Sequence, residues 1–281
     1  VSGSRPPWPR TGSGQRATMA RYRPTPRPPY TPIVPDRNFR FAVTLIDVLA
    51  RLGVEHACVS PGSRNTPLSL ALADSDVTDW SHHDERSGAF FALGIAKTTA
   101  KAVVIVTTAG TAAAELHPAM AEAINGRVPL IAITADRPAA LRNVGAPQTI
   151  DQQDLFGRSV KWSHDIEVPP DPREAVDLAT RMWVEAMSPP AGPVHLNLRF
   201  DEPLMPTDAV TSAADGIPDV AIGRCEPDES AIASLAADLS GRRGIVIAGT
   251  DSEPGLAEAA AVFAAAANWP ILADPLSGLR A

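Results

Sequence analysis

Lysine, cysteine and long apolar runs are scarce in this 281-residue sequence. Only three of its 25 basic residues are Lys, and it has 2 cysteines. Cys58 and Cys225 have neither metal-ligand spacing nor a disulfide framework, which favours a reducing, cytoplasmic environment. No apolar run approaches the roughly 20 residues of a membrane-spanning helix. The sequence therefore predicts no membrane span and no cysteine-based metal site.

Positive charge is scarce outside the first part of the chain. The formal net charge is −7, yet residues 1–37 hold seven Arg and one acid, which leaves 18 basic and 31 acidic residues elsewhere, a formal −13. An acidic body argues against general nucleic-acid binding. With 44% hydrophobic residues, the chain has room for about two domains.

Residues 1–37 also lack the apolar core of a signal peptide. They are rich in Pro and Arg, a composition that predicts a disordered tail. A basic tail can touch anionic membranes or nucleic acid, or it can be an extended start or a dispensable linker. Met19 inside it is a possible internal start.

Strand-like and helix-like patterns alternate along the rest of the chain. Apolar residues at helical spacing predict helices over 38–52, 67–73, 85–100, 111–125, 172–187, 228–239 and 253–267. Strand-like runs, most of them apolar, are predicted over 56–59, 78–81, 102–107, 130–134, 160–167, 194–198, 244–248 and 271–273. This alternation predicts an α/β fold with a mostly parallel, doubly wound sheet.

The same pattern suggests two domains of unequal completeness. The first α/β domain spans 38–200, and residues 201–227 lose periodicity and read as an interdomain linker. Residues 228–281 begin a second α/β domain with two predicted strands. Because two strands are too few for a stable sheet, we expect this second domain to be incomplete.

The acid in Asp84-Glu85-Arg86-Ser87 opens an apolar helical run and is the leading catalytic candidate. A partly desolvated carboxyl group at such a boundary can hydrogen-bond a ring nitrogen, as the aminopyrimidine of thiamine diphosphate requires. An acid in the first turn of a helix also simply complements the helix dipole, so Glu85 taken alone leaves both readings open.

Four further polar loops follow strand-like runs, where open α/β sheets place their ligands: 60–68, 107–111, 134–138 and 145–152. The first combines a tight turn with the Ser63 hydroxyl and the Arg64 guanidinium, which can fork onto a carboxylate. Gly110, in the second, permits close backbone approach at a helix start. Taken singly, each loop is also typical of an ordinary turn.

Together and in this order, the segments resemble the 2-succinyl-5-enolpyruvyl-6-hydroxy-3-cyclohexene-1-carboxylate synthases, the thiamine diphosphate enzymes of menaquinone biosynthesis. The likeness covers residues 38–281 and rests on 60–68, 84–97, 134–138, 145–152 and 273–280. It implies a pyrimidine-binding α/β domain followed by part of a middle α/β domain. Ala109 departs from the family's frequent Ser, and Pro147 stands where Asn is expected.

The resemblance implies a transferase that decarboxylates 2-oxoglutarate and adds the resulting four-carbon unit to isochorismate. Glu85 would be its catalytic residue, and its cofactors would be thiamine diphosphate and Mg²⁺. The cofactor-binding residues would be Glu85, Pro61, Gly62, Gly110 and Gln148. The substrate-binding residues would be Ser63, Arg64, Arg137 and Gln148. The resemblance also implies that the protein forms a homodimer or homotetramer.

The family holds the diphosphate and its metal through a Gly-Asp-Gly segment and a later Asn, supplied to each active site by a second subunit. The 281 residues contain no Gly-Asp-Gly, and the nearest approach is Ala214-Asp215-Gly216. We therefore expect a sequence truncated before the diphosphate-binding domain, with no metal ligands of its own.

Two other functions stay open. A sister carboligase resembling acetolactate synthase would share Glu85 but not the segments 60–64 and 145–152, and an inactive truncated product would bind a partner chain or nothing. His82 and His83 suggest a metal site, but adjacent side chains on a strand point to opposite faces, which favours structural roles.

Overall fold

The computed structural model describes residues 36–223, 226–250 and 255–279, which form two compact units. The first unit ends at Ala221 and the second begins at Ile222. Nearly all of the predicted tail, 1–37, lies outside the described residues, and so does Cys225.

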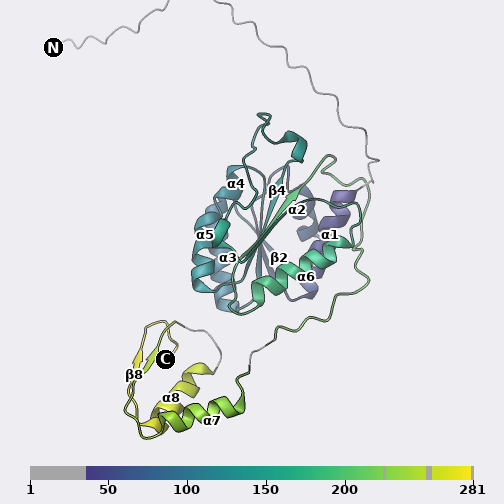
Figure 1. Ribbon diagram of the computed structural model, residues 1–281. Coiled ribbons are helices and arrows are strands. Elements are labelled where there is room, and N and C mark those ends of the chain that lie inside the picture. Colours follow the sequence, from purple (N-terminus) through teal and green to yellow (C-terminus); the bar gives the residue numbers. More distant parts are fainter. Residues whose placement is uncertain (1–35, 224–225, 251–254, 280–281) are drawn as a thin grey trace, which may run out of the picture. The chain divides into compact units, whose positions relative to one another are not determined.

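A six-stranded parallel sheet is the centre of the first unit (Figure 1). Its strands are β1 (His56–Val59), β2 (Thr78–Ser81), β3 (Val103–Thr107), β4 (Leu130–Asp136), β5 (Trp162–Glu167) and β6 (Val194–Arg199). They lie in the order β2-β1-β3-β4-β6-β5, and every neighbouring pair is parallel. The predicted α/β class with a parallel sheet is confirmed.

Helices cover both faces of this sheet. On one face lie α1 (Arg37–Arg51), α2 (Thr66–Ala73) and α6 (Glu174–Met187), and on the other lie α3 (Glu85–Thr99) and α5 (His117–Gly126). Successive residues of β3 point into the two cores: Val104 belongs to the same core as Leu45 of α1, whereas Ile105 belongs to the same core as Met120 of α5. Every residue of β3 and β4 is buried, as expected for strands covered on both sides.

The helix predicted over 111–125 is two helices. A short α4 (Thr111–Ala114) ends before α5 begins at His117. Pro118 occupies the first turn of α5, where its missing N–H is harmless, but the same residue cannot donate to the turn before it. The apolar spacing continues across the break, so periodicity alone did not reveal it.

Residues 201–217, the first part of the predicted linker, pack against α1. The backbone N–H of Thr207 donates to Asp36 Oδ1 (2.7 Å), and that of Ala213 donates to Thr44 Oγ1 (3.0 Å). Leu204 and Ile217 contact the core beneath α1. A segment without periodicity can thus be held in place by single side chains, and the predicted domain boundaries stay predictions.

The second unit contains α7 (Glu229–Leu239), β7 (Val246–Ala248), α8 (Leu256–Ala267) and β8 (Ile271–Ala273), with β7 and β8 paired in parallel. Trp269 packs edge-on against Phe263 and donates from Nε1 to the Arg242 carbonyl (2.8 Å). Ile247 and Leu272 are exposed on the strands. No helix in the described ranges is long and apolar enough to cross a membrane.

Candidate functional site at the carboxyl edge of the sheet

The predicted site segments share one edge of the sheet. Because all six strands are parallel, the loops that follow them emerge together at their carboxyl ends, the usual ligand-binding edge of an open α/β sheet. The segment 60–66 follows β1, Asp84 and Glu85 follow β2, 108–110 follows β3, and 137–153 follows β4.

Asn65 organises the loop after β1. Its side chain is fully buried; its Oδ1 accepts from the Gly62 N–H (2.8 Å), and its Nδ2 donates to the Ser60 carbonyl (3.1 Å). These bonds close the loop from inside and leave Pro61 and Ser63 exposed at its tip. The residues predicted to meet ligands therefore lie at the surface of a loop that Asn65 holds in shape.

The loops after β1 and β3 touch at Gly62. A Cβ atom on Gly62 would lie 2.6 Å from Thr108 Cβ and 2.8 Å from its Oγ1. Any larger residue would push the two loops apart, so this glycine is required by close packing between the loops.

Gly110 and Gln148 are likewise in direct contact. A Cβ atom on Gly110 would lie 2.9 Å from Gln148 Cγ, and Gly110 has φ +86°, a conformation that other residues rarely adopt. Gln148 Nε2 donates to the Ala109 carbonyl (3.0 Å). The close approach predicted for Gly110 is thus an approach of Gln148 from the loop after β4.

Arg64 and Arg137 add positive charge to this edge. Arg64 Nη1 donates to the Phe200 carbonyl (3.0 Å) and lies 3.3 Å from Glu202 Oε1, and its side chain is 13% exposed. Arg137 Nη1 donates to the Gln148 carbonyl (2.9 Å). Burial and then the charge of Arg64 lower the pKa of Arg137, so an anion placed between the two guanidinium groups would relieve their repulsion.

Glu85 is half-buried at the start of α3. Capping of this helix is done by its neighbour, because Asp84 Oδ1 accepts from the Ser87 N–H (2.6 Å). Within the described part of the chain, no hydrogen bond or ion pair engages the Glu85 carboxylate. It is therefore available to an external partner, whereas no bond links it to the other predicted site residues.

His82 and His83 differ in their surroundings. The His82 ring packs against Phe91 with centroids 5.0 Å apart, and His83 is exposed. In the ranges that the structure describes, no group of three or more His, Cys, Asp or Glu side chains could hold a metal ion.

A buried polar network that the sequence reading missed lies beneath the loop after β4. Its centre is Asp165 on β5, whose carboxylate accepts from Arg142 Nη2 (3.0 Å), Asn197 Nδ2 (2.7 Å) and Gln153 Nε2 (2.9 Å) and pairs with Arg199. Arg142 Nη2 also donates to the fully buried Asp136 (2.7 Å).

Burial alone would raise the pKa of Asp165, but hydrogen bonds from Arg142, Gln153 and Asn197 and the charge of Arg199 lower it below its ordinary value. The sequence signal for this network is the alternation of polar and apolar residues along β6. His195, Asn197 and Arg199 share one face, while Leu196 and Leu198 pack into the core on the other.

His195 is fully buried in the same network. Its Nε2 lies 2.8 Å from Thr134 Oγ1, whose single hydrogen is donated to Asn197 Oδ1 (2.8 Å). The hydroxyl must therefore accept from His195 Nε2–H, which places a proton on Nε2. Burial lowers the pKa of His195 to about 4, so the ring at neutral pH is the uncharged tautomer with its proton on Nε2.

The buried His195 should make the first unit sensitive to mild acid. Its pKa falls from 6.5 to about 4 on folding, so below pH 6.5 the unfolded chain takes up a proton that the native chain refuses. Stability present above pH 6.5 is therefore lost as the pH falls, by about 2 kcal/mol between pH 7 and pH 5. Urea unfolding followed by tryptophan fluorescence measures it, since Trp80, Trp162 and Trp183 lie in the first unit.

The control for this prediction is His195→Gln, which cannot titrate. We expect its free energy of unfolding to be lower at pH 7 and nearly constant down to pH 5, since Asp165 titrates only in stronger acid. An equal loss between pH 7 and pH 5 in both proteins would assign the acid sensitivity to other groups.

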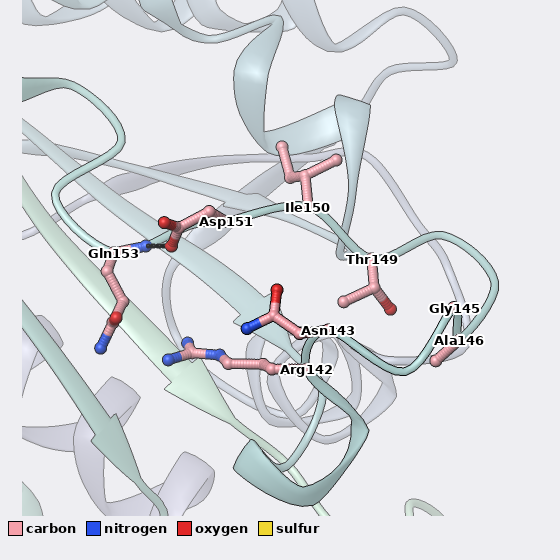
Figure 2. A pocket seen from close by; sticks show the side chains of 8 residues that line it. All are labelled: Arg142, Asn143, Gly145, Ala146, Thr149, Ile150, Asp151 and Gln153. Atoms are coloured by element: carbon pink, nitrogen blue, oxygen red, sulfur yellow. Dashed lines mark hydrogen bonds between the residues drawn. The ribbon is translucent and has the colours of Figure 1, made fainter.

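A cavity of about 200 Å³ opens against the loop after β4, lined by Arg142, Asn143, Gly145, Ala146, Thr149, Ile150, Asp151 and Gln153 (Figure 2). Figure 2 shows the Arg142 side chain extending toward that of Gln153, away from Thr149 and Gly145. None of the predicted site residues lines this cavity.

Comparisons with known proteins agree with this geometry. The family model described as thiamine pyrophosphate enzyme, N-terminal TPP binding domain, matches residues 39–155, the part that holds the predicted cofactor residues. The 2-succinyl-5-enolpyruvyl-6-hydroxy-3-cyclohexene-1-carboxylate synthase of Haloquadratum walsbyi is 44% identical over 264 residues, covering 88% of this chain and 43% of that relative. The synthase of the same name from Geobacillus kaustophilus is 45% identical over 252 residues, with 86% and 44% covered.

Solved structures resemble the fold. A putative thiamin diphosphate-dependent enzyme from Mycobacterium smegmatis superimposes with a TM-score of 0.70 at 22% identity, covering 84% of this chain and 44% of that one. Benzoylformate decarboxylase from Polynucleobacter necessarius gives a TM-score of 0.64 at 23% identity, covering 85% and 44%. The chain spans less than half the length of the curated relatives that it matches.

Proposed function

Because this chain belongs to the family of 2-succinyl-5-enolpyruvyl-6-hydroxy-3-cyclohexene-1-carboxylate synthases, we propose that it supplies the pyrimidine-binding half of their active site. The reaction would be decarboxylation of 2-oxoglutarate and addition of the four-carbon unit to isochorismate, in menaquinone biosynthesis. The observation that supports it most is Glu85, a half-buried carboxylate that has no partner among the residues described while Asp84 caps its helix.

The residues at the carboxyl edge of the sheet fit the pyrimidine part of thiamine diphosphate. Glu85 would hold a proton at a pyrimidine ring nitrogen, a carboxyl-to-nitrogen bond that suits a carboxylate unpaired within 36–223, 226–250 and 255–279. Pro61, Gly62, Gly110 and Gln148 would shape the surface around the ring. When bound, the cofactor supplies the nucleophilic carbon and the electron sink that decarboxylation of a 2-oxo acid requires.

Arginine pairing supports the substrates that we propose. Arg64 and Arg137 are close enough to repel each other, and both 2-oxoglutarate and isochorismate carry carboxylates that would separate the two charges. The exposed Ser63 hydroxyl and the Gln148 amide would bind the remaining oxygens. Their role is to hold the acceptor against the carbon that attacks it.

The diphosphate and its Mg²⁺ would be held by residues beyond these 281. The sequence has no Gly-Asp-Gly, and no carboxylate or His cluster suited to a metal occurs among the described residues. We infer that a complete site needs the diphosphate-binding part of the family, in a homodimer or homotetramer, and that it works in the cytoplasm.

A fusion tests this function. Residues 1–281 would replace the aligned part of the Geobacillus kaustophilus synthase, so that the diphosphate-binding part comes from the relative. We expect the fusion to form product from isochorismate and 2-oxoglutarate with thiamine diphosphate and Mg²⁺, and to release carbon dioxide in step.

Pyruvate as the only 2-oxo acid is the control, since a carboligase resembling acetolactate synthase would use it. A folded fusion that consumes pyruvate but not 2-oxoglutarate would refute the proposed donor.

A further inference from the structure

Gln152 is a fully buried amide at the end of the loop after β4, and it joins three strand ends. Its Oε1 accepts from the Gly110 N–H (2.8 Å), at the loop after β3. Its Nε2 donates to the Ala135 carbonyl of β4 (3.2 Å) and to Asn197 Oδ1 of β6 (2.8 Å). Both the oxygen and the nitrogen of the Gln152 amide therefore form hydrogen bonds at the carboxyl edge of the sheet.

Asn197 fixes the orientation of the Gln152 side-chain amide. Asn197 Oδ1 accepts from Gln152 and Thr134, while its Nδ2 donates to Asp136 (3.0 Å) and Asp165 (2.7 Å). Two carboxylates require the Nδ2 end to face them, so the Oδ1 end must face Gln152. Gln152 in turn presents its own oxygen to Gly110.

The segment between Arg142 and Gln152 is held at its two ends. Arg142 bonds Asp136 and Asp165 at one end, and Gln152 bonds Asn197 at the other. Between them the side chains are exposed or half-buried, and Gln148 alone reaches back to the strand ends, where its Nε2 meets Ala109. The Gln148 carbonyl also accepts from Arg137 Nη1 (2.9 Å), so the position of Gln148 depends on that bond and on the anchor four residues later.

We propose that Gln152 is a positioning residue, which sets the place of Gln148 and Gly110 at the pyrimidine-binding edge. This inference rests on the proposed function, since the buried Gln152 would act on the site through those two residues. The Gly110 N–H, already donated to Gln152, is not free for a ligand. Gly110 therefore serves the site by giving Gln148 room, and Gln152 keeps the two together.

The neighbouring Gln153 is a matched control of the same residue type. Its Nε2 also bonds the network, at Asp165 (2.9 Å), but it contacts neither Gly110 nor Asn197. Gln152→Leu and Gln153→Leu each remove one amide from the same loop. Gln152 is buried and Gln153 is exposed, so Gln153→Leu controls for the loss of a loop amide and of one bond to Asp165, and Gln152→Glu is the control at the buried position itself.

The test uses the full 281-residue chain, labelled for NMR and without ligand. In Gln152→Leu we expect the Gly110 amide to exchange its hydrogen at least 10-fold faster and the Gln148 side-chain amide resonances to move. In Gln153→Leu the Gly110 exchange rate and the Gln148 resonances should stay near those of the unaltered chain. A folded Gln152→Leu with unchanged Gln148 resonances overturns the proposal.

If Gln152→Leu does not fold, the unaltered chain still decides. The Gly110 amide of the unaltered chain should be strongly protected from hydrogen exchange. Hydrogen exchange at Gly110 as fast as at the exposed Val144 would overturn the proposal. Gln152→Glu keeps the acceptor for Gly110 but loses the donor to Asn197. It should retain protection at Gly110 while the Gln148 resonances move, and the loss of that protection contradicts the assigned bond.

Titration with thiamine separates this proposal from the function on which it rests. We expect millimolar thiamine to shift the Gln148 resonances of the unaltered chain and of Gln153→Leu, and to act at least 10-fold more weakly on Gln152→Leu. If the unaltered chain does not respond, the pyrimidine site is refuted, while the ligand-free exchange result still decides the role of Gln152.

Discussion

Glu85→Gln should reduce turnover of the fusion described above by about 100-fold or more while the protein stays folded. Glutamine has the size of glutamate and can form hydrogen bonds, but it cannot hold and release a proton at the pyrimidine nitrogen. Because Glu85 is half-buried and without a partner among the described residues, the change breaks no internal bond. Product formation and exchange of the thiazolium proton are the two measurements.

Asp84→Asn is the control for that loss. It removes the adjacent carboxylate, yet asparagine is as good an N-cap as aspartate, so the bond to the Ser87 N–H survives. Turnover of this variant should stay within about threefold of the parent. If both variants lost turnover equally, or if Glu85→Gln exchanged the thiazolium proton at the parent rate, Glu85 would be only a helix-dipole acid.

The 281-residue polypeptide expressed alone should form no product from isochorismate and 2-oxoglutarate, even with thiamine diphosphate and Mg²⁺. Glu85 and the loops around Gln148 would bind only the pyrimidine part of the cofactor, and the sequence has no Gly-Asp-Gly to hold the diphosphate. A second copy of the same polypeptide would add a second pyrimidine side and no diphosphate site. The expected rate is therefore the rate without protein.

The fusion assayed in parallel is the positive control, because it shares every residue of the polypeptide. Carbon dioxide release tied to 2-oxoglutarate, above the blank and abolished by Glu85→Gln, would contradict the prediction. It would mean that these 281 residues hold the diphosphate by groups other than the family's segment.

The order of helices and strands was predictable because each element carries its own periodicity. The strand over 56–59 was predicted at its observed bounds, since turn residues flank a short apolar run, and the exposed strand over 78–81 was also predicted at its observed bounds. The helix over 111–125 was predicted without its break between Ala114 and His117, because apolar spacing continues through it. The docking of 201–217 was not predictable, since it depends on single bonds such as Thr207 to Asp36.

The sequence by itself determined the chemistry available at this edge: a helix-initial acid, two arginines, close-packing glycines and the order in which they follow parallel strands. Only the tertiary structure decided which of these groups are already engaged. Gly110 is occupied by Gln152 and Gln148, whereas Glu85 is left without a partner among the described residues. The reason is that buried polar groups must find partners, and those partners come from strands far apart in sequence, as Asn197 shows for Gln152.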